Sequence, residues 1–179
     1  MVSSTRRRAL HAAVELVGGE GIRALTHGRV DAAAGLPPGS TSNHFRTRAA
    51  LIAGVIEWIA TEERSDAGLP TISTRDDLVR GLARMIEVQS GPQALRTRAR
   101  YALFIEADVE TSRPLLEQRA TFEARIRGIL RQLGGPPAER QTRFVMATAE
   151  GLLLHRMTVD PEAPVEAVIA RAVDAALAP

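Results

Sequence analysis

The chain has 179 residues, of which 45% are hydrophobic and 25% charged, and its formal net charge at pH 7 is +2. It contains no cysteine and no lysine, which excludes thiol catalysis, disulfide bonds, a phosphate-loop lysine and Schiff-base chemistry. A chain of this length can bury one hydrophobic core and still carry a small additional module. The lack of cysteine is typical of the reducing cytoplasm, where we expect the protein to act.

Basic residues are concentrated near the N-terminus. The first 50 residues hold seven arginines against three acidic residues, a net charge of +4, whereas the rest holds sixteen arginines against eighteen acidic residues, a net charge of −2. This asymmetry predicts an anionic partner for the N-terminal part. Arg6 to Arg8 fit either an arm near a DNA backbone or a solvated basic terminus. No apolar run approaches the roughly 20 residues that span a bilayer, and His11 and Glu15 interrupt the apolar stretch that a signal peptide needs, so neither is expected.

The first predicted helix begins near Thr5. Its apolar face has helical spacing and consists of Leu10, Ala13, Val14 and Val17. The glycines at positions 18, 19 and 21 are expected to end this helix. A phosphate-binding loop is the alternative, but no strand precedes these glycines and no lysine follows them.

Two short helices with a tight turn between them are predicted next. Thr26 is a suitable N-cap for the first, and Gly35 ends it because glycine adopts a left-handed conformation without penalty. Pro37 and Pro38 suit the turn, and the second helix carries Ser40 to Phe45. This spacing predicts a helix-turn-helix whose second helix presents small polar side chains, as a reader of the DNA major groove requires.

The segment that covers this turn and second helix reads GLPPGSTSNHFRTRAAL and resembles the recognition segment of the tetracycline-repressor (TetR) family of one-component transcriptional regulators. The matching positions are Gly35, Ser40, His44, Phe45, Arg48 and Leu51. Two positions depart from the family pattern, because Thr41 stands where a buried Leu, Ile or Val is usual and Ser42 stands where a phosphate-contacting Tyr is usual. The resemblance is confined mainly to residues 5 to 60.

The polar side chains of this segment and the resemblance together give a predicted DNA-binding set. It consists of Thr26, Gly39, Ser40, Ser42, Asn43, His44 and Arg48. Asn43 has the donor and acceptor that read adenine, and the backbone at the start of each short helix is suited to phosphate. For Arg48, a surface charge pair is the alternative to a phosphate contact.

The remainder of the chain is predicted to be helical throughout. Thr47 caps a connecting helix with an apolar face that includes Leu51 and Trp58, and a break follows over residues 65 to 73. Thr74 and Asp77 form a capping box for the next helix. We therefore expect an all-α fold of about nine helices, with a DNA-binding domain at 1–47 and a ligand-binding and dimerisation domain at 48–179.

The last two predicted helices, about 138–158 and 164–177, carry apolar or small side chains on more than one face. We expect them to pair with their symmetry mates in a homodimeric four-helix bundle, as the TetR resemblance also implies. The predicted dimer interface consists of Ala147, Gly151, His155, Val165, Ile169, Ala172 and Val173. The alternative is that these residues complete a core within the chain.

The resemblance implies an apolar effector cavity in the helical body. The predicted pocket residues are Trp58, Tyr101, Phe104, Phe122, Met146 and Glu150. At helical spacing such side chains also fit a plain core. Tyr101 and Glu150 are the polar groups among them that can orient a small molecule.

The sequence offers no catalytic constellation and no metal-ligand spacing, so we expect no enzyme, metal or cofactor. The predicted function is a DNA-binding regulator, most simply a repressor released from a pseudo-palindromic operator by a small-molecule effector. The alternative is a helical small-molecule-binding or interaction module without sequence-specific DNA binding, which the departures at Thr41 and Ser42 leave open.

Overall fold

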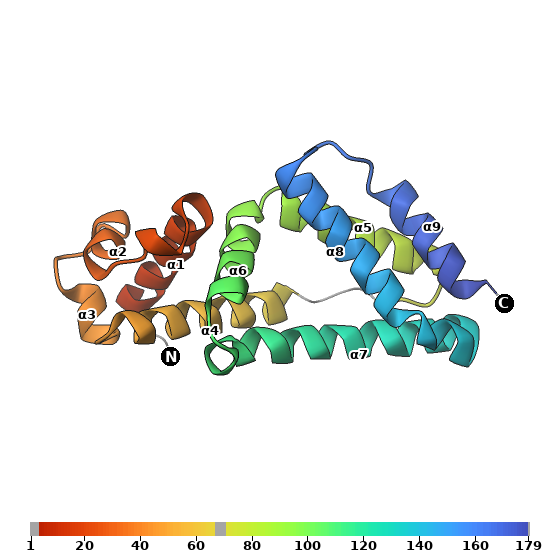
Figure 1. Ribbon diagram of the computed structural model, residues 1–179, viewed down its shortest axis with the longest axis horizontal. Coiled ribbons are helices and arrows are strands. Elements are labelled where there is room, and N and C mark those ends of the chain that lie inside the picture. The colour runs from red at the N-terminus through yellow and green to blue at the C-terminus, as the bar shows by residue number, and fades with distance from the viewer. Residues whose placement is uncertain (1–3, 67–70, 179) are drawn as a thin grey trace. The chain divides into compact units, whose positions relative to one another are not determined.

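The computed structural model describes residues 4–66 and 71–178, and within these ranges it contains nine α-helices, one 3₁₀ turn and no strand (Figure 1). This confirms the predicted all-α fold and its number of helices. No helix in the described ranges is long and apolar enough to cross a membrane. The described residues form two compact units, one within Met1–Ala67 and Leu95–Gln118 and the other within Gly68–Ala94 and Arg119–Pro179.

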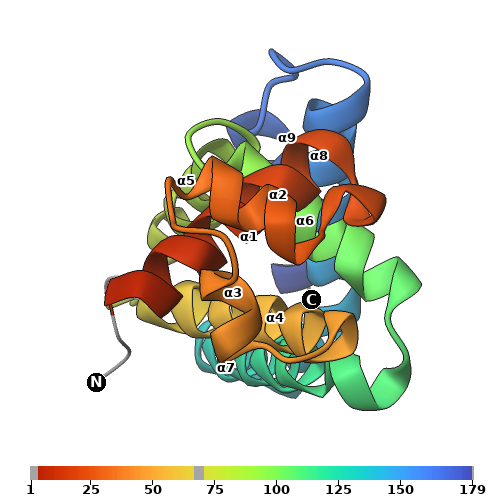
Figure 2. The same cartoon turned by 90° about the vertical axis from the view of Figure 1, so that its left-hand side faces the viewer.

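The first unit contains the N-terminal helices and the helix-turn-helix. Its elements are α1 (Ser4–Glu20), the 3₁₀ turn η1 (Ile22–Ala24), α2 (His27–Ala33), α3 (Ser40–His44), α4 (Arg48–Asp66), α6 (Ala94–Glu106) and the first part of α7 (Val109–Arg140). Figure 2 views this unit from the side of α2 and α3. The predicted caps are confirmed, because Thr26 precedes α2 and the Thr47 hydroxyl accepts the Ala50 amide at 3.1 Å.

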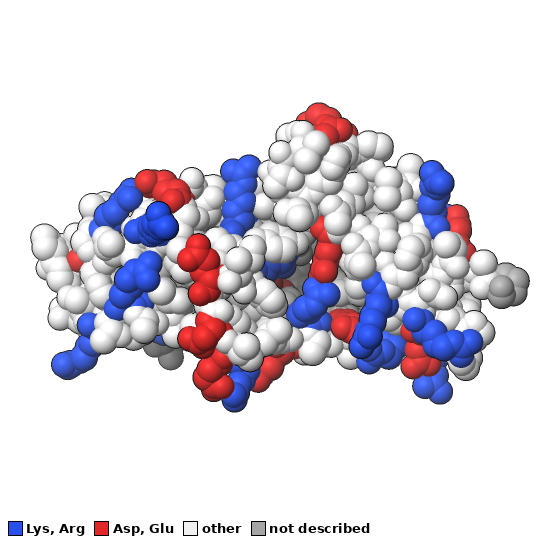
Figure 3. Space-filling model, viewed as in Figure 1, with Lys and Arg blue, Asp and Glu red and all other residues white. Residues whose placement is uncertain are grey.

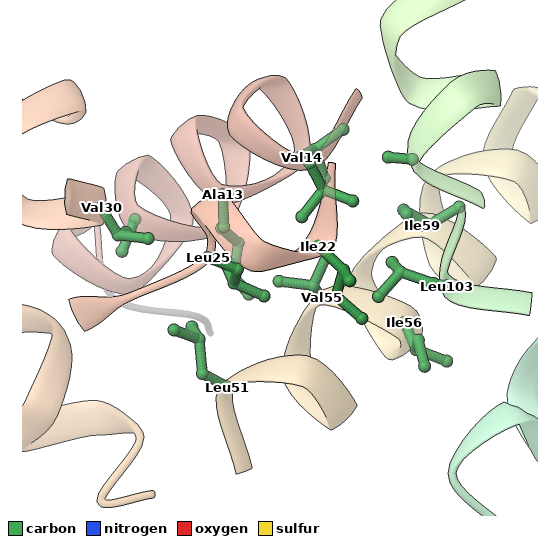
Figure 4. Packing of buried hydrophobic residues seen from close by; sticks show 14 of the residues in the cluster. Ala13, Val14, Ile22, Leu25, Val30, Leu51, Val55, Ile56, Ile59 and Leu103 are labelled. Atoms are coloured by element: carbon green, nitrogen blue, oxygen red, sulfur yellow. The ribbon is translucent and has the colours of Figure 1, made fainter. Parts of the chain in front are cut away.

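The core of this unit joins side chains from every one of its elements except α3. Figure 4 labels those from α1, η1, α2, α4 and α6. Leu10 of α1, Leu25 after η1 and Leu51 of α4 are each at most 1% exposed. Leu103 of α6 and Leu115 of α7 belong to the same cluster. The apolar stripes predicted for the first helix and for the connecting helix therefore face one common core.

The glycines at positions 18, 19 and 21 do not all end the first helix as predicted. The helix α1 continues through Gly18 and Gly19 to Glu20, and Gly21, with φ of 82°, lies beyond its end. A Cβ added at Gly18 would lie 2.1 Å from the carbonyl oxygen of Leu95 in α6. Gly18 is thus required for a close approach between two helices, so the prediction that it ends the helix is wrong.

The second unit contains α5 (Arg75–Ser90), the rest of α7, α8 (Thr142–Thr158) and α9 (Glu166–Leu177). The capping box of Thr74 and Asp77 is confirmed, with both reciprocal hydrogen bonds present. The predicted break at 65–73 includes residues 67–70, which lie outside the described residues. An ion pair between Arg75 and Asp174, at 2.8 Å, joins α5 to α9.

The start of α8 differs from the prediction, and the reason lies in α7. The helix α7 begins at Val109, where the Asp108 carboxylate accepts the Thr111 amide at 2.8 Å and caps the helix. Gly135, with φ of 68°, interrupts the regular helix of α7, and helical structure resumes through Arg140. The helix α8 therefore begins at Thr142 rather than near residue 138.

Candidate nucleic-acid interface

The turn between α2 and α3 is closed by both backbone and side-chain contacts. Gly35 has φ of 60°, which glycine tolerates readily, and the Leu36 amide donates to the Asp31 carbonyl oxygen at 2.8 Å. The Arg8 guanidinium of α1 donates to the carbonyl oxygens of Ala34 and Gly35 at 2.7 and 3.0 Å. These are carbonyls at the C-terminal end of α2, which lack partners within the helix.

A buried carboxylate caps the start of α3. Asp31 of α2 is only 3% exposed, and its oxygens accept hydrogen bonds from the Gly39 amide at 2.8 Å, the Thr41 amide at 2.8 Å and the Thr41 hydroxyl at 2.5 Å. Burial alone raises the pKa of Asp31. The hydrogen bonds from Thr41 and Gly39, together with the charge of nearby His27, outweigh that effect and hold the pKa below its ordinary value of 3.8.

A second side chain of α2 contacts the other end of α3. Nε2 of His27 lies 2.6 Å from the carbonyl oxygen of Phe45, and this nitrogen must carry the proton because a carbonyl only accepts. The Phe45 ring is 4% exposed, and the Arg6 guanidinium carbon lies 5.2 Å from its centre. The ring fits against α4 at Gly54, where an added Cβ would lie 2.3 Å from it.

The outer face of α3 presents the predicted small polar side chains. Ser42, Asn43 and His44 are exposed, whereas Ser40 is half-buried. The Ser40 hydroxyl donates to the Pro37 carbonyl oxygen at 2.6 Å, and the Ser42 hydroxyl donates to the Gly39 carbonyl oxygen at 2.9 Å. Each hydroxyl can still accept a hydrogen bond, while Asn43 and His44 remain exposed on the same short helix.

The backbone at the start of α3 differs from the expectation of a phosphate contact. The amides of Gly39 and Thr41 already donate to Asp31, and the Ser40 amide donates to the Pro37 carbonyl oxygen at 3.1 Å. Since these groups are occupied, the start of α3 is a poor anion site. At the start of α2, the Thr26 hydroxyl accepts the Arg29 amide at 3.4 Å. This helix start is therefore more accessible to an anion than the start of α3.

The arginines of the N-terminal segment fall into two groups. The arginines of the first group have partners inside the chain, and Arg8 is one of them. Arg48 donates to the Ile22 carbonyl oxygen at 2.8 Å, and Arg29 forms an ion pair with Glu20 at 2.7 Å. Arg7, Arg23 and Arg46 are exposed and have no hydrogen-bond or ion-pair partner in the described part of the chain. Figure 3 shows basic side chains on the part of the first unit formed by α1 to α4.

The predicted pocket residues are divided between the two units, so a shared pocket stays a prediction. In the first unit, Trp58 and Tyr101 are half-buried and Phe104 is 38% exposed. In the second unit, Phe122 is half-buried and Met146 is 5% exposed. The Glu150 carboxylate forms an ion pair with Arg119, so it has a partner within its own unit.

The predicted dimer residues divide by helix. Val165, Ile169, Ala172 and Val173 are buried within the single chain, where α9 packs against α5 and α8, as the alternative of an intrachain core expects. The three residues predicted on α8 are exposed, namely Ala147, Gly151 and His155. The prediction did not include Phe144 and Leu154, which are 46% and 49% exposed on the same helix. Their spacing from Gly151 was the signal that could have identified them.

Sequence reasoning also missed the inward-facing residues of the helix-turn-helix. Asp31 and His27 hold the two ends of α3, and Arg8 holds the end of α2. The one available signal was Thr41, because a polar residue at a position that is usually buried requires a polar partner. Within the described residues, no cluster of three or more histidine or acidic side chains is arranged to hold a metal ion.

The family model described as "Tetracyclin repressor-like, C-terminal domain" matches residues 73–179, which is more than half of the chain. The chain therefore belongs to the tetracycline-repressor (TetR) family of regulators. None of the curated proteins with which it was compared matches.

Solved structures share the fold over nearly the whole length of the chain. A TetR-family member from Streptomyces coelicolor A3 is 24% identical with a TM-score of 0.75, and the match covers 99% of this chain and 100% of that one. The multidrug binding protein EbrR, complexed with ethidium, is 24% identical with a TM-score of 0.70, and the match covers 98% and 99%. A transcriptional regulator from Rhodococcus sp. Rha1 is 18% identical with a TM-score of 0.74, and the match covers 98% and 94%.

Proposed function

We propose that this protein is a homodimeric, sequence-specific DNA-binding regulator that acts in the cytoplasm as a repressor and leaves its operator when a small molecule binds. Residues 1–47 form the DNA-binding domain and residues 48–179 the ligand-binding and dimerisation domain. Two α3 helices about 34 to 36 Å apart would match one turn of DNA in a pseudo-palindromic operator.

The observation that carries this proposal is the construction of α3. Its exposed residues include Asn43 and His44, while both of its ends are hydrogen-bonded to α2. A side chain that reads base edges must be held in one pose, since base contacts are short and directional. The departure at Thr41 has a polar partner in Asp31, which weakens the alternative of a head that has lost DNA binding.

The arginine partners support a revised set of phosphate contacts. Arg48 is used within the chain, whereas Arg46 lies two residues after α3, exposed and without a partner among the residues that the structure describes. We assign Arg46 to the DNA backbone beside the predicted base-reading residue Asn43. A contact of this kind adds affinity for all sequences and makes binding depend on salt.

The exposed apolar stripe of α8 supports the homodimer. Phe144, Ala147, Gly151 and Leu154 recur at helical spacing, and a Cβ added at Gly151 would meet nothing within 4 Å in the described part of the chain. Val168 of α9 is a further apolar side chain, 36% exposed. An antiparallel pairing of these helices with a second copy would cover the stripe.

The effector of this proposal is a small organic molecule bound among the predicted pocket residues. EbrR, which shares the fold, has been solved with ethidium and with proflavin. A panel that includes these two dyes is therefore a reasonable first screen for release of this protein from DNA. Release would follow if the ligand binds more tightly to a conformation whose two α3 helices no longer match the operator.

The test is a salt titration of binding to DNA immediately upstream of the protein's own gene, beside a scrambled duplex, for wild type, Asn43→Ala and Arg46→Ala. We expect a specificity ratio above roughly 10³ for the wild type and a collapse of that ratio in Asn43→Ala. Arg46→Ala should weaken binding to both duplexes and reduce the salt slope by about 1.

Equal binding of the wild type to both duplexes, repeated with sequences selected from a random pool, would contradict the proposal. It would favour the alternative of a ligand-binding or interaction module without sequence-specific DNA binding.

A further inference from the structure

We propose that Asp31 and Thr41 are a coupled pair that positions the recognition helix α3, and that this pair determines the specificity of DNA binding although neither side chain contacts DNA. Asp31 is 3% exposed and Thr41 is fully buried, so both lie behind the face of α3 that carries Asn43. This inference rests on the proposed DNA-binding function and adds to it two positioning residues.

The two side chains depend on each other. A buried carboxylate is costly unless it is hydrogen-bonded, and Asp31 accepts three hydrogen bonds, two of them from Thr41. A buried hydroxyl likewise requires a partner, and the Thr41 hydroxyl donates to Asp31. Replacing either residue alone leaves the other with a buried polar group that has lost a partner.

The helix α3 needs this support because it is very short. It has five residues, and Thr41 is the only one of them that is buried. A helix of this length is unstable by itself, and its apolar anchors, Leu36 and Phe45, flank it rather than belong to it. The hydrogen bonds between Asp31 and Thr41 therefore join α2 to the first turn of α3.

The same pair also makes the start of α3 less able to bind phosphate. Free amides at a helix start attract phosphate, but here the Gly39 and Thr41 amides already donate to a negatively charged group. The Asp31 carboxylate thus accepts the hydrogen bonds that the amides at the start of α3 would otherwise donate to phosphate. Discrimination between DNA sequences is then made by the side chains on the outer face of α3. Loss of the pair should reduce the fraction of molecules in the binding pose, which lowers specific affinity by the same factor.

The test compares variants at both positions against a short duplex selected from a random pool by the wild-type protein, and against a scrambled duplex. Asp31→Ala should weaken binding to the selected duplex at least about tenfold and leave binding to the scrambled duplex within about twofold, because non-specific binding depends on surface charge. Thr41→Ser, which keeps the hydroxyl, should retain the specificity ratio that Thr41→Val loses.

The coupling itself is read from the double variant. Thr41→Val should weaken specific binding in the wild-type background and restore part of it in the Asp31→Ala background, where it removes the unpaired hydroxyl. Glu20→Gln is the matched control, because Glu20 pairs with Arg29 at an exposed site of the same unit and has no hydrogen bond or ion pair to α3. We expect this control to bind within twofold of the wild type.

A measurement without DNA separates the pair from the proposed function. Amide hydrogen exchange at Gly39 and Thr41 should accelerate at least about tenfold in Asp31→Ala, while exchange at the Leu51 amide, which donates to the Thr47 carbonyl oxygen, should not change. Unchanged exchange at Gly39 and Thr41, or full specificity in folded Asp31→Ala, would overturn the inference. If the wild type selects no sequence from the pool, the proposed function fails, and the exchange result still decides whether the pair holds α3.

Discussion

Asp31 carries a charge at a site that is almost fully buried, and it does so because three hydrogen-bond donors are directed at it. The carboxylate accepts hydrogen bonds from the amides of Gly39 and Thr41 and from the Thr41 hydroxyl at the start of α3. Such an arrangement stabilises the ionised form relative to the protonated form. One residue thereby links the ionisation of a side chain to the position of the helix proposed to read DNA.

The lowered pKa of Asp31 predicts a specific loss of stability in acid. Its folded-state pKa lies below the ordinary value of 3.8, so its contribution to stability is complete above about pH 4 and is lost as the pH falls through the folded value. We expect the free energy of unfolding of the wild type to fall more steeply below pH 4 than that of Asp31→Asn. Urea unfolding between pH 6 and pH 3, at about half-unit steps, measures this difference. Parallel curves for the two proteins would contradict it.

Gly54 makes room for the ring of Phe45, and this predicts an unusual effect of a helix-favouring substitution. Gly54→Ala places a Cβ 2.3 Å from a ring carbon, so we expect a loss of roughly 1 to 3 kcal/mol from overpacking, partly offset by about 1 kcal/mol of helix propensity. Gly128→Ala in α7 is the control, because no described residue outside its own turn of helix lies within 4 Å of the added Cβ, and it should be neutral or stabilising. Thermal unfolding of both variants gives the comparison, and equal behaviour would show that the ring moves freely.

At the scale of single elements, α8 differs from its neighbours in having two apolar faces. One face is buried within the chain and includes Val145, Met146 and Leu153. The other is exposed and includes Phe144 and Leu154. An exposed stripe of this kind is typical of a helix that pairs with another chain.

The exposed stripe of α8 predicts the effect of a charge on assembly. Leu154→Glu should convert a dimer to a monomer, because a carboxylate would be buried without a partner when two α8 helices pair. Ile105→Glu in α6 introduces the same charge at a residue that is 81% exposed and belongs to the other unit, so it should leave the assembly unchanged. Sedimentation equilibrium distinguishes the two. A wild-type monomer, or a dimer that persists in Leu154→Glu, would exclude this stripe as the interface.

At the scale of the whole molecule, the chain passes from the proposed DNA-binding domain into the remainder through α4. Trp58 lies on this helix, half-buried, and packs against the core of the first unit. At this position a residue can transmit a conformational change from the proposed ligand-binding domain to the helix-turn-helix. Such coupling is a difference in ligand affinity between two conformations of the protein.

Trp58→Ala should therefore reduce the response of DNA binding to an effector. We expect the variant to bind operator DNA in the absence of effector and to be released by it at least about tenfold less readily than the wild type, because the large side chain no longer joins α4 to the core. Operator binding measured across an effector titration, with effector affinity measured separately, checks this prediction. A normal shift in DNA affinity with normal effector binding would show that coupling does not pass through Trp58.

The local features of this protein follow from the sequence alone. Thr26, Thr47 and Thr74 each cap the helix that follows them, and Gly35 ends α2, because these contacts lie within a few residues along the chain. The apolar stripes predicted the helices for the same reason, since helical spacing is a local property. The all-α fold and the family resemblance both rest on such local signals.

Only the tertiary structure decided which side chains are partners across the chain. Asp31 pairs with a residue 10 positions away, and Arg8 and Arg48 each donate to carbonyl oxygens at least 26 positions away. The stripe of α9 became core because α5 and α8 cover it. Helical spacing shows which face of a helix is apolar, but the element that covers this face is selected by the packing of the whole chain. The sequence therefore determined the helices and the family, and their packing determined which polar groups hold the recognition helix.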